Sequence, residues 1–236
     1  MTAACSTAKS TEGTGGVAEN NSPRSLEGTL RIVGNLPYYI TTPILLGILE
    51  KGVPAKSITV MVQKEVAQRI CAAPGGRDYG VLSVSLQYYA DCSCVLDVPS
   101  EFFTPRPKVD SAVVHMILKK DRLLAPMEEP QFFALVKAAF SQRRKTLLNS
   151  LTGFRPGSAA RGERPSSGAA YSGKDRAVKT GPAKKSSGAP SCAPLAKEQV
   201  LALLNAADID PGRRPETLSI EEFAHLSRTL NCSDPA

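Results

Sequence analysis

The sequence predicts an α/β fold in which a sheet domain is followed by a small α-helical domain. Strand and helix patterns alternate through residues 30–120, and helical patterns alone follow. A length of 236 residues allows one substantial domain with a smaller one. We place a disordered segment at 1–28, the sheet domain at 29–120 and the helical domain at 121–236.

The first strand and helix surround the segment RIVGNLPYYITTP, residues 31–43. Residues 30–33 form a short apolar strand. Thr42 is a good N-cap residue with Pro43 at the first helical position. Apolar residues then follow at helical spacing, and Gly52 closes the helix. The chain therefore runs from a strand through Asn-Leu-Pro-Tyr almost directly into a helix.

The middle of the sheet domain has clear and ambiguous parts. A β-branched run at 57–62 predicts a buried strand, and a helix over roughly 64–72 follows, stopped by a Pro-Gly-Gly sequence. The segment YGVLSVSLQYYA (79–90) fits alternation and helical spacing equally well, so strand and helix both stay open there. Residues 92–98 predict a further strand.

Prolines at 99, 105 and 107 predict an extended loop after that strand. The remaining elements are a strand at 113–118, a helix over about 130–141, a helix at 197–207, a turn at 208–214 and a last helix through Leu230. Ser219 with Glu222 three residues later makes a capping box for the last helix.

Residues 153–194 predict a disordered basic insertion that interrupts the helical domain. They are rich in Gly, Ser, Pro, Ala and basic residues, with almost no large apolar side chains. Eight Lys or Arg residues stand there against Glu163 and Asp175, so the insertion holds +6 of the net charge of +7. The charge therefore does not by itself predict a positive face on the folded part.

Composition argues against several classes of protein. No apolar run approaches the roughly 20 residues that span a bilayer. The start, MTAACSTAKSTEGTGG, lacks the charged and apolar regions of a secretion signal. The six cysteines are scattered without a CxxC pair, so neither a zinc site nor a disulfide framework is indicated. We expect a cytoplasmic protein without a membrane segment or a metal.

The Asn-Leu-Pro-Tyr turn suits methylation of an exocyclic amine on a base. In open α/β sheets, ligands bind beyond the carboxyl ends of the strands, where Asn35 lies. The amine's lone pair is delocalised into the ring. The Asn35 side-chain oxygen and the Leu36 carbonyl can accept its two N–H groups, which favours a tetrahedral nitrogen with its lone pair aimed at a methyl donor. Pro37 fixes φ and holds the preceding carbonyl, and Tyr38 can stack on the base.

A structural alternative for this turn is a capped strand-to-helix connection. That connection needs Asn and Pro but not Tyr, so we favour the functional interpretation.

Several further motifs occur in order along the chain. They are VQKEVAQRI (62–70), YGVLSVSLQYY (79–89), FFTPRPKVDSAVV (102–114), FSQRRKTLLNSL (140–151) and IDPGRRPETLSIEEFAHL (209–226). Together with GNLPYYITTPI (34–44), they resemble the ribosomal RNA adenine N6-dimethyltransferases that use S-adenosylmethionine. The resemblance covers about residues 29–151 and 196–230. It implies the C-terminal half of a Rossmann-like class I methyltransferase sheet, followed by a small helical RNA-binding domain.

The resemblance also implies roles for individual residues. Asn35 would contact both the cofactor and the target amine, Leu36 would supply a carbonyl acceptor and Pro37 would hold it. Tyr38 would stack on one face of a flipped adenine, and Phe103 would close on the other. The alternative for Phe103 is an ordinary core aromatic.

RNA phosphate contacts are implied for a set of basic residues: Arg106, Lys108, Arg143, Arg144 and Lys145. Three adjacent charges on a helix cannot all face one way, and such a run is usually a solvated surface.

Other polar candidates have structural explanations. His115 and His225 have no partner at metal-ligand spacing, and helix pairing and loop capping explain Glu65 and Asp110 as well as a catalytic role does.

By resemblance, the chain would transfer methyl groups from S-adenosylmethionine to two adjacent adenines of small-subunit rRNA. Its partner would be a partly assembled small ribosomal subunit, which it would bind as a monomer. One alternative is a non-catalytic rRNA-binding module that docks through residues 103–151. Another is an amino-methyltransferase acting on DNA, whose Asn/Asp-Pro-Pro-Tyr turn is related but which lacks the later motifs.

The family's cofactor site lies mostly before Asn-Leu-Pro-Tyr. It begins with a Gly-rich loop after a first strand, and an acidic residue ends the next strand. In this sequence about 28 polar residues precede Leu30, and TEGTGG (11–16) has neither a strand before it nor a helix after it. We therefore expect the cofactor-binding half to be missing, Asn35 to be the cofactor contact that remains, and S-adenosylmethionine to bind weakly or not at all. We also expect an exposed sheet edge.

Overall fold

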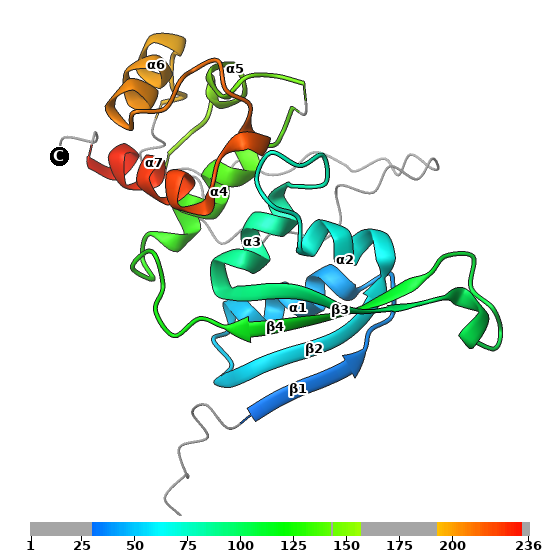
Figure 1. The fold of residues 1–236 in the computed structure, drawn as a ribbon. Helices are drawn as coiled ribbons and strands as arrows, with labels where there is room; N and C mark the ends of the chain where they lie inside the picture. Colours follow the sequence, from blue (N-terminus) through cyan, green and yellow to red (C-terminus); the bar gives the residue numbers. More distant parts are fainter. Residues whose placement is uncertain (1–29, 143, 157–192, 233–236) are drawn as a thin grey trace, which may run out of the picture.

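The structure, a computed structural model, describes residues 30–142, 144–156 and 193–232. A four-stranded sheet carries helices on one face, and a layer of further helices packs beside them (Figure 1). The predicted α/β class, with helices alone after the last strand, is confirmed. The disorder predicted at 1–28, most of the insertion at 153–194 and residue Arg143 lie outside the described residues.

The sheet has the strand order β1-β2-β4-β3. Its strands are β1 (Leu30–Asn35), β2 (Ala55–Gln63), β3 (Ala90–Val98) and β4 (Ser111–Leu118). β1 and β2 are parallel, and β4 is antiparallel to both β2 and β3. Asn35 is paired with Met61, and Ser111 is paired with both Gln63 and Val98. The ends of β1, β2 and β3 therefore meet the start of β4 at one end of the sheet.

Helix α1 (Thr41–Glu50) follows β1 after a short turn. The predicted N-cap at Thr42 is wrong, because the helix begins one residue earlier and the Thr41 hydroxyl donates to the Pro37 carbonyl at 3.1 Å. Pro43 is tolerated at the third helical position, where a backbone N–H would have no partner inside the helix. Gly52 closes the helix with φ of 63°, a left-handed conformation that suits glycine.

The ambiguous segment 79–90 is helix α3 (Val81–Tyr89), and β3 begins directly after it. Contacts with α2 (Lys64–Ile70) favour the helix. The Ser83 hydroxyl donates to the Arg69 carbonyl at 2.5 Å, and Gln87 Nε2 donates to the carbonyls of Ile70 and Ala72 at 2.8 Å. α3 thus satisfies carbonyls that the end of α2 leaves without helical partners.

The helical layer consists of α4 (Glu129–Ala139), α5 (Leu147–Leu151), α6 (Lys197–Ala206) and α7 (Ile220–Cys232), with the short 3-10 turn η3 (Pro215–Thr217) just before α7. A second short turn, η1 (Ser100–Phe102), follows β3. The predicted capping box of α7 is confirmed. The Ser219 N–H donates to Glu222 Oε2 at 2.7 Å, and the Glu222 N–H donates to Ser219 Oγ at 3.2 Å.

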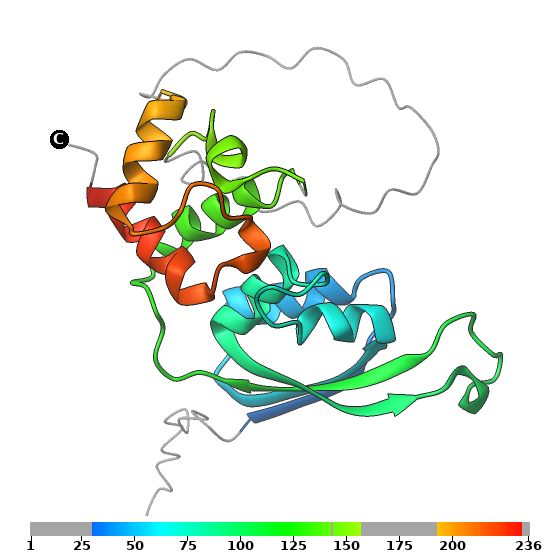
Figure 2. The same ribbon diagram turned by 45° about the horizontal axis from the view of Figure 1, so that its top comes forward.

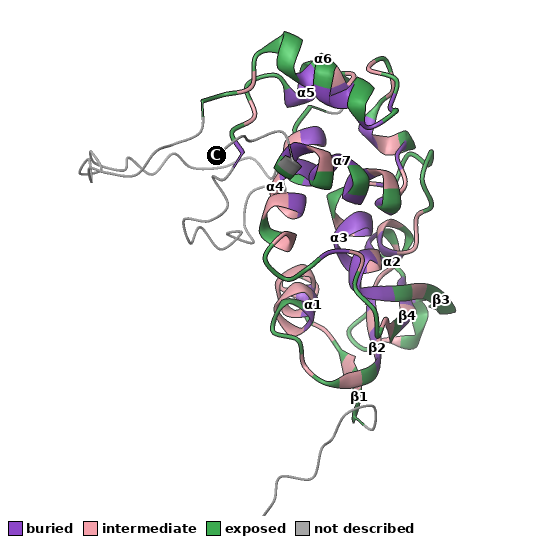
Figure 3. Ribbon diagram, turned by 90° about the vertical axis from the view of Figure 1, so that its left-hand side faces the viewer, coloured by how far each residue is buried: buried purple, intermediate pink, exposed green. Residues whose placement is uncertain are grey.

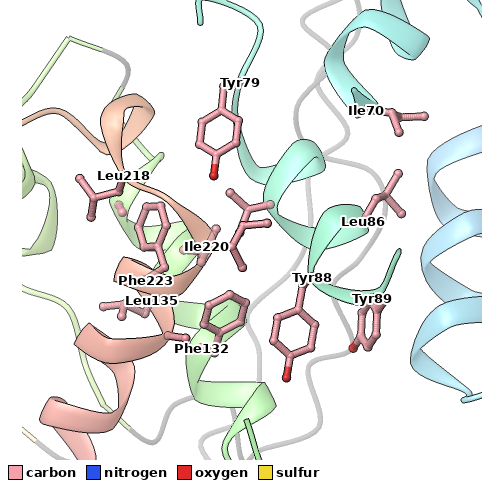
Figure 4. Close-up of a cluster of buried hydrophobic side chains, with 14 of the residues drawn as sticks. Ile70, Tyr79, Leu86, Tyr88, Tyr89, Phe132, Leu135, Leu218, Ile220 and Phe223 are labelled. Atoms are coloured by element: carbon pink, nitrogen blue, oxygen red, sulfur yellow. The ribbon is translucent and has the colours of Figure 1, made fainter. Parts of the chain in front are cut away.

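One continuous apolar core joins α3 to the helical layer (Figure 4). The Tyr88 ring lies 4.9 Å from Phe132 between centroids, and Phe140 lies 5.8 Å from Phe223. In the view of Figure 3, buried positions gather between the sheet and its helices and inside the helical layer. Burial raises the pKa of Tyr88 to about 12, so its hydroxyl stays protonated at neutral pH.

The two faces of the sheet differ. Helices α1, α2 and α3 cover one face, and no other described element covers the opposite one (Figure 2). On β1, an edge strand of the described sheet, the Val33 side chain is 78% exposed. The predicted exposed sheet edge is therefore present in the described part of the chain.

Candidate functional site

The turn after β1 presents two acceptors at the end of the sheet. The Leu36 N–H donates to the Met61 carbonyl at 3.2 Å, which extends the β1–β2 pairing by one residue. The Pro37 carbonyl is occupied, because it accepts the Ile40 N–H and the Thr41 hydroxyl, both at 3.1 Å. Within the described residues, the exposed Asn35 amide and the Leu36 carbonyl have no hydrogen-bond partner. They are therefore free to bind a ligand.

Tyr38 is held from both ends. Its backbone lies in the turn that leads into α1, and its hydroxyl lies 2.7 Å from Ser111 Oγ at the start of β4. Ser111 is fully buried, whereas the Tyr38 side chain is partly exposed. The ring thus has a fixed position and an accessible surface.

Phe103 follows η1 in the loop between β3 and β4. Its N–H donates to the Ser100 carbonyl at 3.3 Å, and it is partly exposed. It takes part in none of the ring contacts of the described residues, so it does not behave as a core aromatic. Because this loop ends at β4, beside the end of β2, Phe103 belongs to the same end of the sheet as Asn35 and Tyr38.

Arg106 and Lys108 lie on the same loop and are both exposed. Arg106 Nε donates to Ser100 Oγ at 3.2 Å. Lys108 takes part in none of the ion pairs found among the described residues, and it lines a shallow hollow of about 310 Å³. That hollow is bounded by Gln63, Lys64, Glu65, Lys108, Val109 and Asp110. Two exposed basic groups therefore lie on the loop between β3 and β4, at the same end of the sheet as the turn.

Arg144 and Lys145 lie elsewhere, on the connection between α4 and α5. The helix predicted over about 130–141 ends at Ala139, so the basic run follows it in a turn, where the Lys145 N–H donates to the Gln142 carbonyl at 3.1 Å. Both side chains are exposed. Arg143 lies outside the described residues. The basic set is thus divided between the sheet end and the helical layer.

The weaker candidates have structural contacts. Glu65 pairs with Arg69 at 4.0 Å along α2, and the Asp110 carboxylate accepts the Ser100 N–H at 2.9 Å. His115 Nδ1 lies 2.8 Å from Thr59 Oγ1 on the neighbouring strand. In the part of the chain that the structure describes, no group of three or more His, Cys, Asp or Glu residues could hold a metal ion. There, too, no helix is long and apolar enough to cross a membrane.

The structure adds residues that the sequence did not single out. Ser111 and Lys64 stand at the site end of the sheet, and Tyr39, 85% exposed, follows Tyr38. The hydrogen bond from Lys64 to Asp97 at 2.9 Å raises the pKa of that lysine. Ser111 carried no local signal, because its hydrogen-bond partner Tyr38 lies 73 residues away in the chain.

S-adenosylmethionine fits the described residues poorly. β1 is an edge strand, so no described strand or loop lies on its outer side to supply backbone N–H groups or a carboxylate to a nucleoside. At the carboxyl end of this edge strand, Asn35 is exposed and its amide has no described partner. The described residues thus leave the outer side of β1 without groups that could hold a nucleoside.

Comparisons with known proteins agree on one family. A model of the family described as ribosomal RNA adenine dimethylase matches residues 17–163. A protein of Geobacillus sp. (strain WCH70) named ribosomal RNA small subunit methyltransferase A is 40% identical over 201 residues, and one of the same name from Clostridioides difficile (strain 630) is 41% identical over 204 residues. These matches cover 85% and 86% of this chain but 57% of each relative. The chain thus spans little more than half the length of these curated relatives.

Solved structures share the fold. A dimethyladenosine transferase from Plasmodium falciparum matches with a TM-score of 0.62 at 21% identity, over 86% of this chain and 66% of that one. The 23S rRNA methyltransferase ErmE matches with a TM-score of 0.51 at 21% identity, over 87% of this chain and 66% of its own.

Proposed function

Because this chain belongs to the ribosomal RNA adenine dimethylase family, we propose that it provides the base-recognising part of an enzyme that dimethylates N6 of two adjacent adenines in small-subunit rRNA. The activity would belong to ribosome assembly, with the partly assembled small subunit as the partner. The curated relatives named ribosomal RNA small subunit methyltransferase A support this choice of RNA.

The observation that carries the proposal is the pair of free acceptors beside a fixed aromatic ring. The Asn35 amide oxygen and the Leu36 carbonyl have no partner among the described residues, and the Tyr38 hydroxyl is anchored 2.7 Å from Ser111. A turn that served only to connect β1 and α1 would need the occupied Pro37 carbonyl, but neither the free acceptors nor the tyrosine.

The geometry suits an amine that must lose its conjugation. Two acceptors bind the two N–H groups of an adenine N6, and this moves the lone pair out of the ring system. Pro37 limits the motion of the Leu36 carbonyl. Tyr38 offers a stacking surface to an adenine that has left its helix, and Phe103 offers a second one. The proton of the amine can leave after methyl transfer, so no general base is required.

Basic residues in two places support binding of the RNA backbone. Arg106 and Lys108 lie on the loop that carries Phe103, and Arg144 and Lys145 lie between α4 and α5. We propose that all four contact phosphates, with Arg143 as a further contact. Such contacts neutralise backbone charge and release counterions, so binding should weaken as salt increases.

The methyl donor of this family is S-adenosylmethionine, which supplies an electrophilic methyl group. The described residues offer it Asn35 and little else, so we expect this chain to bind the donor weakly or not at all. Calorimetric titration of the chain with S-adenosylmethionine tests this expectation, and micromolar affinity would contradict it.

The proposed activity is tested by transfer of labelled methyl groups to small-subunit particles that lack the modification. Asn35→Ala should reduce transfer by about 10²-fold or more, as removal of one transition-state hydrogen bond does elsewhere, and should spare RNA binding. Asn205→Ala, an exposed asparagine on α6, is the matched control and should transfer normally. Equal and measurable transfer by wild type and Asn35→Ala would refute the proposed role of Asn35.

A second candidate function is an rRNA-binding module without catalysis. The incomplete donor side of the described site favours it. This alternative would be established if the wild-type chain bound small-subunit rRNA in a salt-dependent manner but transferred no methyl group at saturating donor.

A further inference from the structure

Asp110 and Ser111, at the start of β4, touch both aromatic segments of the proposed base site. Ser111 Oγ lies 2.7 Å from the Tyr38 hydroxyl. Asp110 Oδ1 accepts the Ser100 N–H at 2.9 Å, and the Asp110 carbonyl accepts the Lys64 N–H at 3.0 Å. Two consecutive residues therefore connect the turn after β1, the end of β2 and the loop after β3.

The contact to Tyr38 fixes the ring at its far end. A tyrosine side chain has two main torsions, and the backbone turn fixes only its near end. Ser111 is fully buried in the sheet, where it is paired with Gln63 and Val98, so its hydroxyl cannot move far. Anchoring the Tyr38 hydroxyl to it selects one ring orientation before any base arrives. A stacking surface ordered in advance loses less entropy on binding.

The contact to Ser100 fixes the loop that carries Phe103. Ser100 accepts the Phe103 N–H through its carbonyl at 3.3 Å and the Arg106 Nε–H through its hydroxyl at 3.2 Å. Its own N–H is bound by Asp110. The single residue Ser100 thus links Phe103 and Arg106 to Asp110, and this ties the loop to the first residues of β4.

We infer that Ser111 and Asp110 are positioning residues, which set the Tyr38 ring and the Phe103 loop at the spacing that receives a flipped adenine. Neither residue needs to touch the base. The inference rests on the proposed function, because it assigns a purpose to the two aromatic residues that the proposed function uses.

The test is a double-mutant cycle on base recognition. The probe is a short RNA hairpin with 2-aminopurine beside a loop adenine, whose fluorescence responds when the neighbouring adenine leaves the stack. The full chain is compared with Tyr38→Phe, Ser111→Ala and the double variant, and unfolding midpoints are measured in parallel. Ser93→Ala is the control, since this exposed serine lies on the edge strand β3, away from the site end, and its hydroxyl donates to the His115 carbonyl.

If Ser111 acts through the Tyr38 hydroxyl, each single variant should bind the probe roughly three- to tenfold more weakly. The double variant should then be no weaker than the weaker single variant, because both remove the same hydrogen bond. The inference for Ser111 would be overturned if Ser111→Ala bound the probe as tightly as Ser93→Ala. It would also be overturned if the losses of affinity in the two single variants added up in the double variant. If Ser111→Ala does not fold, the result for Tyr38→Phe alone decides. Tyr38→Phe that binds the probe as tightly as wild type would then overturn the inference.

The Asp110 contact is tested separately with a rescue. Asp110→Ala removes the acceptor of the Ser100 N–H, whereas Asp110→Asn keeps an oxygen in its place. We expect Asp110→Ala to bind the hairpin roughly three- to tenfold more weakly and Asp110→Asn to bind it almost normally. Equal binding by Asp110→Ala and wild type would overturn this part.

The proposed function and the inference fail in different ways. Wild-type chain that binds the hairpin without any change in 2-aminopurine fluorescence overturns base recognition and the inference with it. If the wild-type chain does change the 2-aminopurine fluorescence but the double-mutant cycle shows no coupling between Tyr38 and Ser111, only the inference is overturned.

Discussion

The core of the helical layer and the site end of the sheet are held together by different forces. Between α3 and α4, Tyr88 and Phe132 are at most 1% exposed, and their rings are in contact. At the site end, Phe102 is 74% exposed, and a few polar contacts through Ser111 and Asp110 order the surface. Burial therefore provides stability in the helical layer, while the site end keeps polar groups and rings available for a ligand.

The largest expected effect comes from the same substitution made in both regions. Phe132→Ala should lower the free energy of unfolding by about 3–5 kcal/mol, because it removes a fully buried ring and leaves a cavity. Phe102→Ala removes an exposed ring and should change it by less than about 0.5 kcal/mol. Urea unfolding followed by circular dichroism measures both, and equal losses would contradict the comparison.

A smaller effect, with a pH dependence, is expected at the cap of α7. The hydrogen bond from Arg213 is the main cause that lowers the pKa of Glu222 below its ordinary value of 4.5. The stability that the ionised Glu222 carboxylate contributes is therefore complete above pH 4.5 and is lost as the pH falls through the lowered pKa of Glu222. Glu222→Gln should cost about 1 kcal/mol at neutral pH, mostly through the weakened cap and ion pair.

Unfolding midpoints in urea, measured from about pH 7 to about pH 3, test this pH dependence. Wild type should lose more stability than Glu222→Gln over the acidic part of that range. Glu221→Gln is the control, since Glu221 is exposed and forms no ion pair with another described residue. Parallel curves for wild type and Glu222→Gln would show that the pairing has no such role.

The basic turn between α4 and α5 should affect RNA binding without affecting stability. Arg144→Ala with Lys145→Ala should reduce the slope of log affinity against log salt by about one unit per lost phosphate contact. Lys51→Ala with Lys56→Ala removes two exposed charges at the opposite end of β2 and should leave the slope unchanged. Fluorescence anisotropy with a labelled rRNA fragment measures the affinity at each salt concentration. Identical slopes for the two double variants would indicate that residues 144–145 form a solvated surface.

The smallest effect on stability is expected where the effect on chemistry is largest. Asn35→Ala should change the free energy of unfolding by less than about 0.5 kcal/mol, because its amide is exposed and has no described partner. Thermal and urea unfolding of the purified variant measure this. A loss above about 1 kcal/mol would mean that Asn35 mainly stabilises the turn.

Local sequence was sufficient where a structure depends on neighbouring residues. The capping box of Ser219 and Glu222 and the glycine that closes α1 at Gly52 follow from residues within one helical turn. The start of α1 could not be predicted to the residue, because the Thr41 hydroxyl returns to the Pro37 carbonyl instead of leaving Thr42 to cap the helix. Segment 79–90 was undecided because its helix is selected by contacts with α2.

The sequence was enough to predict the α/β class, most of the elements and the Asn35–Tyr38 turn, since periodicity, turn residues and proline geometry act over short distances. Only the tertiary structure decided which groups surround that turn. The β4 register places Ser111 beside the end of β2, and this brings its hydroxyl to Tyr38 across 73 residues. Pairing between distant segments depends on the packing of the whole sheet, so no local pattern could have predicted that hydrogen bond.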